Sequence, residues 1–477
     1  MSSDLTYPSP AGTSLWPERP RVIEITHAVL AKLRRMRSAA EPGPAIAAVG
    51  AEAPRPWRAA FAVLMGNTLA WFDIAIYGFL AVTVAKVFFP AGSETASVLL
   101  ALGTFGMTFV TRPLGAIVIG RFADQHGRRA GLALATALTM GGTAMIAFAP
   151  TYAMVGLTAP VLVVLARLIQ GFASGGEFGS ATAFLSEQQP GRRGFFASWQ
   201  FAAQALAAIL ATAFGVALNL ALSEQQLEAW GWRIPFLFGV SMGPLAYSLR
   251  AALDETSVFR SMQGRGATPM RQALRNGKTR ILTSFGLVVF GTVANYTILF
   301  MPTYAIYELG MPAYDGFMGG LVAAMVQVVL IPLAGLLSDR WGRSWIAIAV
   351  CIASLIASYP LFAWLVAEPT VERLMLFQVA VSILVALYAG SVAVLMADLF
   401  APHMRTTGVA VSYSLGVAIS GGLAPFFNVW LIDLSGSRAA PSWYLMLAAA
   451  VSLVALAIAR SSRWADEPAP QAAAATR

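Results

Sequence analysis

The sequence predicts an all-α membrane protein in which twelve transmembrane helices form two six-helix halves. Three observations predict this fold class: an apolar composition, a regular series of long apolar stretches, and a motif that recurs six helices later. Of the 477 residues, 57% are hydrophobic and 12% are charged, whereas soluble chains carry about 25% charged residues. The composition excludes a soluble enzyme, a disordered protein and a nucleic-acid-binding domain, despite the formal net charge of +9.

A spanning helix needs about 20 predominantly apolar residues, and twelve stretches of the chain meet this requirement. Several are longer, so we expect these to tilt or to extend beyond the bilayer. The predicted spans are 58–88, 95–119, 130–149, 157–186, 195–221, 233–252, 280–308, 313–337, 345–366, 373–399, 406–433 and 441–460.

The spans divide the chain into five segments. We expect residues 57–252 to form an N-terminal six-helix bundle and residues 280–460 a C-terminal one, joined by the basic cytoplasmic loop 253–279. Residues 1–56 are predicted to be a disordered basic tail with one short amphipathic helix near 22–38, and residues 461–477 a C-terminal tail.

Charge in the loops predicts the orientation. With both termini inside, the inner segments hold 26 Lys and Arg residues and the outer loops hold 4. Cytoplasmic loops carry such an excess of positive residues, so both termini are predicted to be cytoplasmic. The single Cys351 excludes a disulfide framework, and the scattered His27, His126 and His403 argue against a metal site.

An internal repeat connects the two halves. The sequence Gly120-Arg-Phe-Ala-Asp124-Gln-His-Gly127-Arg128-Arg129 follows the second span, and Gly335-Leu-Leu-Ser-Asp339-Arg-Trp-Gly342-Arg343 follows the eighth, 215 residues later. Parallel repeats of this kind are typical of transporters, whose substrate site lies between the halves near the bilayer midplane. The glycines at 127 and 342 are expected to allow a tight turn between helices.

This repeated motif resembles the signature loop of the major facilitator superfamily. Further stretches within residues 57–460 resemble its metabolite–proton symporter branch: Trp71-Phe72-Asp73, Arg112-Pro113-Leu114-Gly115-Ala116 and Arg167-Leu-Ile-Gln170-Gly171-Phe172-Ala-Ser174-Gly175-Gly176-Glu177. The stretches 158–165, 421–425 and 443–446 are most similar to citrate–proton and tricarballylate–proton symporters. Gln125, where the family loop usually has a basic residue, and Asn428 depart from the pattern.

The resemblance implies a major facilitator fold and a multi-pass protein of the bacterial inner (plasma) membrane. It also implies a monomer that transports a small anionic metabolite with a proton as the coupling ion, without another cofactor or a nucleic-acid partner. No Gly-x-x-x-x-Gly-Lys-Ser/Thr phosphate-binding loop is present in the sequence, so we do not expect an enzyme that uses ATP.

Ionisable groups inside a bilayer are costly, so each is a functional hypothesis. Asp73 shares one helix face with Gly66 and Tyr77, and a buried carboxylate near an arginine suits proton coupling. The alternative is a static ion pair with Arg167. Glu177 is expected either to share in proton transfer or to pair with a gate arginine.

Two arginines are candidates for binding a substrate carboxylate, because the guanidinium fork can bind carboxylates with two hydrogen bonds. Arg167 begins a polar stripe with Gln170, Ser174 and Glu177, for which the alternative is a helix–helix contact. Arg112 could bind the substrate or an acidic gate residue. These two are the only Lys or Arg residues in the predicted spans that lie away from the ends.

Other polar residues in the spans are weaker candidates for substrate contact, each equally suited to a helix–helix hydrogen bond. They are Asn67, Tyr77, Gln200, Gln204, Asn295, Tyr296, Gln327 and Tyr388. A third set is predicted to form weak ion pairs in a cytoplasmic gate that breaks in each transport cycle. It comprises Asp124, Arg128, Arg129, Glu187, Asp339, Arg343 and Arg405.

The sequence therefore predicts a proton-coupled symporter of a small carboxylate, such as citrate, tricarballylate or a related di- or tricarboxylate. One alternative is a symporter of a zwitterionic osmolyte such as betaine or proline, and another is a drug efflux transporter. A sensor that binds without turnover is a further alternative. Two arginines within the membrane favour an anionic solute over a lipophilic cation.

Overall fold

A computed structural model describes residues 56–91, 94–261 and 277–461 of the chain. The predicted tails, the helix near 22–38 and most of the linker loop lie outside the described residues. The described part contains helices and no strands, so the predicted all-α fold class is confirmed. The described residues belong to one compact unit, and the predicted division into domains stays a prediction.

Seven main helices form the N-terminal half, which we define as residues 56–251. They are α2 (Pro56–Phe79), α3 (Ala81–Phe88), α4 (Glu94–His126), α5 (Arg128–Ala147), α7 (Thr158–Ser186), α8 (Arg193–Ala221) and α10 (Arg233–Ala251). Short helical turns lie between them or follow α10: α6 (Tyr152–Val155), α9 (Glu224–Gln226), α11 (Ser257–Arg260), a 3₁₀ turn (Pro190–Arg192) and a π turn (Leu227–Gly231).

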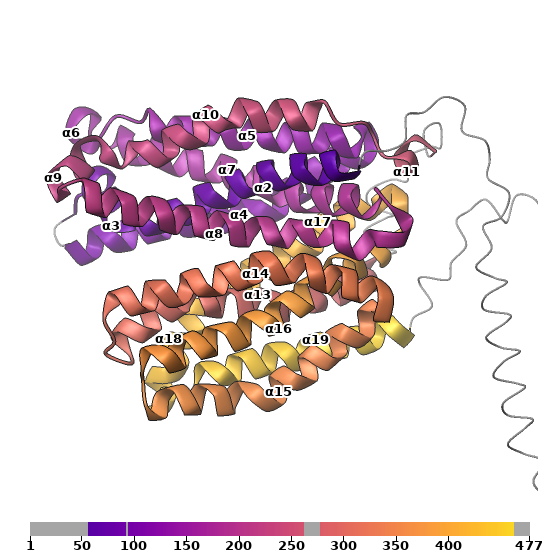
Figure 1. Ribbon diagram of the computed structural model, residues 1–477. Helices are drawn as coiled ribbons and strands as arrows, with labels where there is room; N and C mark the ends of the chain where they lie inside the picture. Colours follow the sequence, from indigo (N-terminus) through magenta and orange to yellow (C-terminus); the bar gives the residue numbers. More distant parts are fainter. Residues whose placement is uncertain (1–55, 92–93, 262–276, 462–477) are drawn as a thin grey trace, which may run out of the picture. The chain divides into compact units, whose positions relative to one another are not determined.

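The C-terminal half comprises residues 278–461. Its main helices are α13 (Lys278–Tyr307), α14 (Ala313–Trp341), α15 (Arg343–Ala367), α16 (Val371–Asp398), α17 (Arg405–Gly416), α18 (Ala424–Ser435) and α19 (Pro441–Ser461). A 3₁₀ turn (Pro402–Met404) precedes α17, and a π turn (Val417–Gly421) follows it. Figure 1 shows the helices of each half grouped together, with α8 and α17 beside the opposite half.

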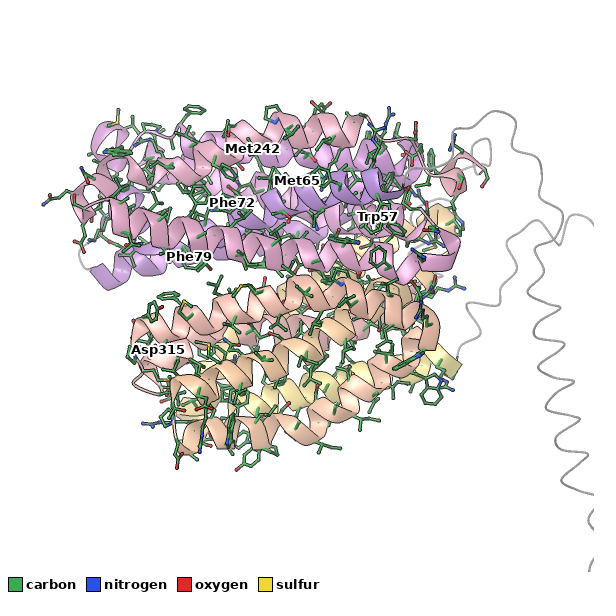
Figure 2. All side chains as sticks on the ribbon, viewed as in Figure 1. Trp57, Met65, Phe72, Phe79, Met242 and Asp315 are labelled. Carbon is green, nitrogen blue, oxygen red and sulfur yellow. The ribbon has the colours of Figure 1, made fainter. Side chains whose placement is uncertain are left out.

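Ten helical segments of the described chain are long and apolar enough to cross a membrane. α4, with 33 residues, and α10, with 19, pack lengthwise against α7 and α5. Counting these two gives the predicted six spans in each half. Large apolar side chains also point outward around the helices (Figure 2), including Leu157, Leu220 and Ile356, which are at least 70% exposed. Such a surface suits lipid rather than water.

The main differences between the predicted spans and the helices concern four spans. The first span is two helices, because the chain turns at Leu80 between α2 and α3. The eleventh is broken by the π turn at 417–421, a common site of helix irregularity. The second and eighth continue through the repeated motif to His126 and Trp341, so most of the motif is helical.

Only one residue of each motif forms the turn itself. Gly127 has φ of 113° and Gly342 has φ of 94°, and in each case the next helix begins at the following arginine. Residues with side chains rarely adopt this backbone region. The prediction that these glycines allow tight turns is therefore confirmed.

Close packing of α4 against α7 positions the middle of the N-terminal half. Gly171 and Gly175 of α7 face α4, where a methyl group at either position would overlap a backbone carbonyl oxygen, of Thr108 or Arg112 respectively. Small residues allow helix backbones to approach in membranes. The two glycines thus determine how deeply Arg112 lies between the helices.

We predict that Gly175→Ala destabilises the protein, because overpacking a tight interface costs about 1–3 kcal/mol. Gly141→Ala on α5 is the matched control, since a methyl group there would meet no atom within 4 Å. The measurement is the temperature at which the detergent-purified protein loses its monodisperse size-exclusion peak. Equal stability of the two variants would contradict this account of the α4–α7 interface.

Candidate functional site

Asp73 lies in the middle of a buried polar cluster in the N-terminal half. It comes from α2 and is 3% exposed, and Arg167 of α7 places Nη1 3.6 Å from Asp73 Oδ2. Gln170 bridges the pair, because its amide nitrogen donates to Asp73 Oδ2 and its oxygen accepts from Arg167 Nη1 at 2.9 Å. The same nitrogen lies 3.2 Å from the Thr143 hydroxyl on α5. The cluster thus joins three helices.

Tyr77 completes this cluster one turn further along α2. The Arg167 guanidinium lies 3.7 Å from the centre of the Tyr77 ring, a cation–π contact that stabilises a desolvated cation. The structure therefore contains the Asp73–Arg167 ion pair, which is part of both hypotheses for Asp73, proton coupling and a static ion pair. Tyr77, predicted as a substrate contact, lies against Arg167.

Arg112 is a second buried arginine, and unlike Arg167 it forms no ion pair within the described chain. It is 2% exposed, and its Nη2 donates to Ser174 Oγ at 2.9 Å. Its Nε and Nη1 have no hydrogen-bond partner among the residues that the structure describes. The guanidinium instead lies over the rings of Trp71, at 5.1 Å, and Phe109, at 5.6 Å. Burying a cation without a counter-charge costs several kcal/mol, by order of magnitude, so this group is suited to receive an anion.

Aromatic side chains of the C-terminal half border Arg112. Tyr296 and Tyr413 lie within electrostatic range of it, and the ring of Tyr296 is 6.3 Å from that of Phe109. Tyr413 also stacks on Phe178, with ring centres 3.3 Å apart. Arg112 therefore lies at the junction of the two halves, and Tyr413 is a contact residue that sequence reasoning missed.

Glu177 pairs with an arginine that the sequence analysis did not select. Arg250 of α10 donates from Nη2 to Glu177 Oε1 at 2.7 Å and from Nη1 to Thr136 Oγ1 at 2.6 Å. Arg250 has no exposed surface, so an arginine at the end of a predicted span is a third buried cation near the site, beside Arg112 and Arg167. The Cα of Arg250 lies near the end of α10, and only its long side chain extends into the interior. The position of Arg250 in the sequence therefore does not reveal that its charge is buried.

The weaker candidates are placed as follows. Asn67 donates to the backbone carbonyl of Gln200 at 3.0 Å, and Tyr388 to that of Leu287 at 2.7 Å, so these two make helix–helix contacts. Gln204 donates to the Tyr413 hydroxyl at 3.3 Å, across the two halves. Gln200 is buried, and its side-chain amide has no partner within the described chain. Gln327 is buried and Asn295 half-buried.

Two aspartates of the repeated motif connect the halves at the end of the bundle where the motifs lie. Asp124 accepts hydrogen bonds from the backbone N–H groups of Thr406, at 3.2 Å, and Thr407, at 2.9 Å, which begin α17. Asp339 accepts from those of Gly194, at 2.8 Å, and Phe195, at 3.0 Å, which begin α8. Each aspartate thus caps a helix of the opposite half and also interacts with its positive dipole end.

Ion pairs surround each of these two caps in matching positions. Glu187 lies 2.8 Å from Arg405 and 3.6 Å from Arg128. In the repeat, Asp398 lies 2.7 Å from Arg193 and 2.8 Å from Arg343. Arg193 and Asp398 were missed by sequence reasoning, although the internal repeat predicts them as counterparts of Arg405 and Glu187. We call the two caps and these pairs the gate network.

Arg129 differs from the other predicted gate residues. Its described hydrogen bonds go to the Leu253 carbonyl, from Nη1 at 3.0 Å, and to Glu255, from its backbone N–H at 3.1 Å. It therefore contacts the segment after α10 and makes no described contact across the halves. That segment supports the gate network in another way, because Thr256 donates to Glu187 Oε2 at 2.6 Å.

Two repeated helical halves, a buried charged cluster and an ion-paired gate network between the halves define a membrane transporter of the alternating-access kind. The chain belongs to the major facilitator superfamily, which confirms the resemblance seen in the sequence. Residues 59–280 match the family described as sugar (and other) transporter, and residues 316–477 match the Major Facilitator Superfamily.

Known relatives cover most of the chain. It is 37% identical to a citrate–proton symporter of Salmonella typhi, over 83% of this chain and 92% of that protein. It is 34% identical to the alpha-ketoglutarate permease of Escherichia coli, with 83% and 92% covered, and 31% identical to the proline/betaine transporter of Salmonella typhimurium, with 83% and 82% covered.

A solved structure shares the fold. The proton:xylose symporter bound to 6-bromo-6-deoxy-D-glucose aligns with a TM-score of 0.71 and 16% identity, over 85% of this chain and 95% of that chain.

We predict that Asp124→Ala favours opening of the gate network, because an N-cap contributes about 0.5–2 kcal/mol, roughly 2- to 30-fold in an equilibrium. A cysteine introduced as Ser198→Cys, in a Cys351→Ser background, reports the opening. Position 198 has no exposed surface and lies beside Gly335, so a thiol reagent should label this cysteine faster when the gate network opens. Asp433→Ala, on an exposed part of α18, is the control. Substrate affinity should stay within a few-fold; unchanged labelling, or a large loss of binding, would refute the assignment.

Proposed function

We propose that the protein is a proton-coupled symporter of a small carboxylate, with di- and tricarboxylates such as citrate or tricarballylate as the substrate class. The observation that carries this proposal is Arg112, a buried guanidinium at the junction of the halves with two nitrogens unpartnered in the described chain. Its planar fork matches a carboxylate. Symport of citrate by a relative 37% identical supports the same class.

Coupling is assigned to the Asp73–Arg167 pair. When Asp73 binds a proton, its attraction for Arg167 is lost, and this guanidinium becomes available to a second carboxylate of the substrate. Ser174, which holds Arg112, lies seven residues from Arg167 along α7, about 10 Å at 1.5 Å per residue. The two arginines thus serve different parts of one extended anion.

The osmolyte alternative rests on the relatives that transport proline and betaine. A quaternary ammonium is usually bound by a cage of aromatic rings. Here the rings of Trp71 and Phe109 already contact the Arg112 guanidinium, so this aromatic pair is engaged by a cation of the protein itself. A drug efflux function has no specific observation in its favour.

The proposal includes the setting of transport. We place both termini in the cytoplasm, on the charge distribution of the loops, and the protein in the bacterial inner membrane, as one bacterial relative is named an inner membrane metabolite transport protein. The gate network then closes the cytoplasmic end. A monomer, with the proton as its only coupling ion, is the simplest functional unit.

We predict that Arg112→Lys and Arg167→Lys each raise the Km for citrate or tricarballylate at least about tenfold, because a point charge cannot reproduce the planar fork and disrupted buried charge pairs cost about 2–5 kcal/mol. The assay is uptake of labelled substrate into proteoliposomes with an imposed pH gradient. Arg373→Lys, at a partly exposed ion pair with Glu368, is the control. If betaine competes better than every carboxylate, the osmolyte reading replaces this one.

Asp73→Asn tests the coupling assignment. A side chain that cannot titrate cannot carry the proton, so accumulation driven by a pH gradient should be abolished, whereas counterflow exchange of substrate should survive at least in part. Both are measured on the same proteoliposomes, with Asp433→Asn as the control. A variant at position 73 that still concentrates substrate against its gradient excludes Asp73 as the coupling group.

A further inference from the structure

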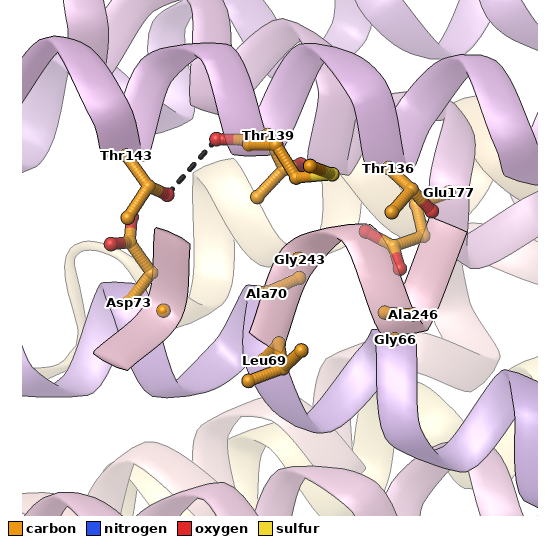
Figure 3. Close-up of a pocket in the computed structure, with 12 residues that line it drawn as sticks. Gly66, Leu69, Ala70, Asp73, Thr136, Thr139, Thr143, Glu177, Gly243 and Ala246 are labelled. Carbon is orange, nitrogen blue, oxygen red and sulfur yellow. Dashed lines mark hydrogen bonds between the residues drawn. The ribbon is translucent and has the colours of Figure 1, made fainter. Parts of the chain in front are cut away.

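A small cavity lies inside the N-terminal half, apart from the junction with the C-terminal half. Helices α2, α5, α7 and α10 enclose it, and it measures about 20 Å³. A water molecule needs roughly 10–15 Å³, so the cavity can hold at least one. Figure 3 shows Asp73 and Thr143 at one end of it and Glu177 and Thr136 at the other.

Three threonines of α5 line the cavity between the two carboxylates. Thr136, Thr139 and Thr143 lie at positions i, i+3 and i+7, so they share one helix face about 10 Å long. Gln170 and Glu177 of α7 are also seven residues apart, and the two faces run in register. The hydroxyls of α5 therefore span the distance from the Asp73 cluster to Glu177.

The hydroxyl group of Thr139 is the one whose surroundings indicate a bound water molecule. Thr139 Oγ1 is buried without a hydrogen-bond partner among the described residues, whereas Thr143 Oγ1 donates to the Thr139 carbonyl at 2.9 Å and Thr136 Oγ1 to the Leu132 carbonyl at 2.8 Å. Buried polar atoms are rarely unsatisfied, and cavity waters commonly bond to them. The position of Thr139, midway between the carboxylates, is where a bridging water would bond.

The charged groups at the two ends of the cavity differ. At one end, Asp73 faces Arg167 and Tyr77, and at the other, Glu177 faces Arg250. α5 contributes no charged side chain to the lining. Arg250 also packs against Gly66, where a methyl group would overlap its guanidinium. The arginine thus closes the cavity on the side of the gate network.

We propose that the coupling proton leaves Asp73 through this cavity, inside the N-terminal half, and reaches Glu177 by way of water held at Thr139. This route rests on the proposed proton-coupled function and adds a path separate from that of the substrate. The Asp73 carboxyl gives its proton to the water at Thr139, and the proton moves on through the threonine hydroxyls that line the cavity, each hydroxyl accepting one proton as it gives up another. The Glu177 carboxylate receives the last proton, and Asp73 is left as the anion that pairs with Arg167 again.

Arg250 controls the far end of this route. As long as Glu177 is ionised, Arg250 is held by it and its positive charge opposes the passage of a free cation. Protonation of Glu177 weakens the pair and lets the side chain of Arg250 move aside, so that the proton can leave toward the end of the bundle that carries the gate network. The ion pair therefore limits proton leak between cycles.

Two substitutions test the route without removing a charged group: one reduces the volume of the cavity, and the other removes the hydroxyl group to which the water would bond. Gly239→Ala adds a methyl group whose one near neighbour is the Thr143 methyl, 3.2 Å away, and Thr139→Val removes the hydroxyl. Gly141→Ala, with open space around the new methyl, and Thr212→Val, on α8 with its hydroxyl bonded to the Ala208 carbonyl, are matched controls. All four are reconstituted in proteoliposomes with labelled citrate.

Positioned proton relays accelerate transfer by about 10²–10⁴-fold, so both cavity variants should slow uptake driven by a pH gradient at least about tenfold. Counterflow exchange of citrate, which needs no net proton release, should stay near that of the wild type, and the controls should change neither rate. If the cavity variants slow both processes equally, or neither, the route is wrong.

A second readout does not depend on citrate. The infrared band of the protonated Asp73 carboxyl, assigned by its absence in Asp73→Asn, should exchange hydrogen for deuterium at least about tenfold more slowly in Gly239→Ala than in Gly141→Ala. Equal exchange rates would overturn the route. Absence of citrate transport by the wild type, with slowed exchange in Gly239→Ala, would instead refute the proposed substrate and leave the route supported.

Discussion

The need to compensate charge within a membrane organises this molecule. In the part of the chain that the structure describes, every Asp, Glu and Arg residue that is buried as a whole belongs to the N-terminal half. At the depth of the site, Asp73 compensates Arg167 and Glu177 compensates Arg250, which leaves the positive charge of Arg112. Because an unpaired buried ion is costly, this surplus charge is the physical reason for an anion to bind there.

The two halves therefore contribute different chemistry to the same junction. The N-terminal half supplies the charges, and the C-terminal half supplies tyrosines such as Tyr296 and Tyr413, whose hydroxyls can orient an anion without adding charge. At the gate network the halves are instead equivalent, because each provides an aspartate that caps a helix of the other. The ion pairs of Asp398 with Arg193 and Arg343 are partly exposed and individually weak, which suits an interface that must break and re-form, whereas those of Glu187 with Arg128 and Arg405 are largely buried.

The sequence alone identified what depends on residue type and spacing. Asp73, Arg112 and Arg167 could be found because a charge within an apolar stretch is conspicuous, and the repeated motif placed Asp124 and Asp339 in equivalent positions. Arg250 could not be found in this way, since its Cα lies at a helix end and only the side chain extends into the interior. The repeat makes Asp398 and Arg193 the counterparts of Glu187 and Arg405. That the two residues form an ion pair is visible only in the structure, because they lie on different helices.

Helix breaks were also beyond sequence reasoning. The turn at Leu80 and the π turn at 417–421 lie within long apolar stretches, next to Gly78 and to Gly421 and Gly422 respectively. Glycine makes a break easier, but other predicted spans contain glycines without a break, so composition alone does not say where the helix is interrupted. The cavity beside Thr139 is a similar case: it depends on the small residues Gly239 and Gly243 of α10 facing α5, a relation between two distant segments that periodicity does not reveal.

Charge balance also explains how proton and substrate would be coupled in the proposed cycle. With Asp73 ionised, one carboxylate is enough to neutralise Arg112, and further negative charge on the substrate would be left without a partner. Protonating Asp73 frees Arg167, and the site then compensates two carboxylates at once. A dicarboxylate or tricarboxylate therefore binds best together with a proton, and loss of that proton into the N-terminal half restores the Asp73–Arg167 pair and expels the anion. Coupling on this scheme needs no contact between proton and substrate, only competition between a carboxylate of the protein and one of the substrate for the same guanidinium.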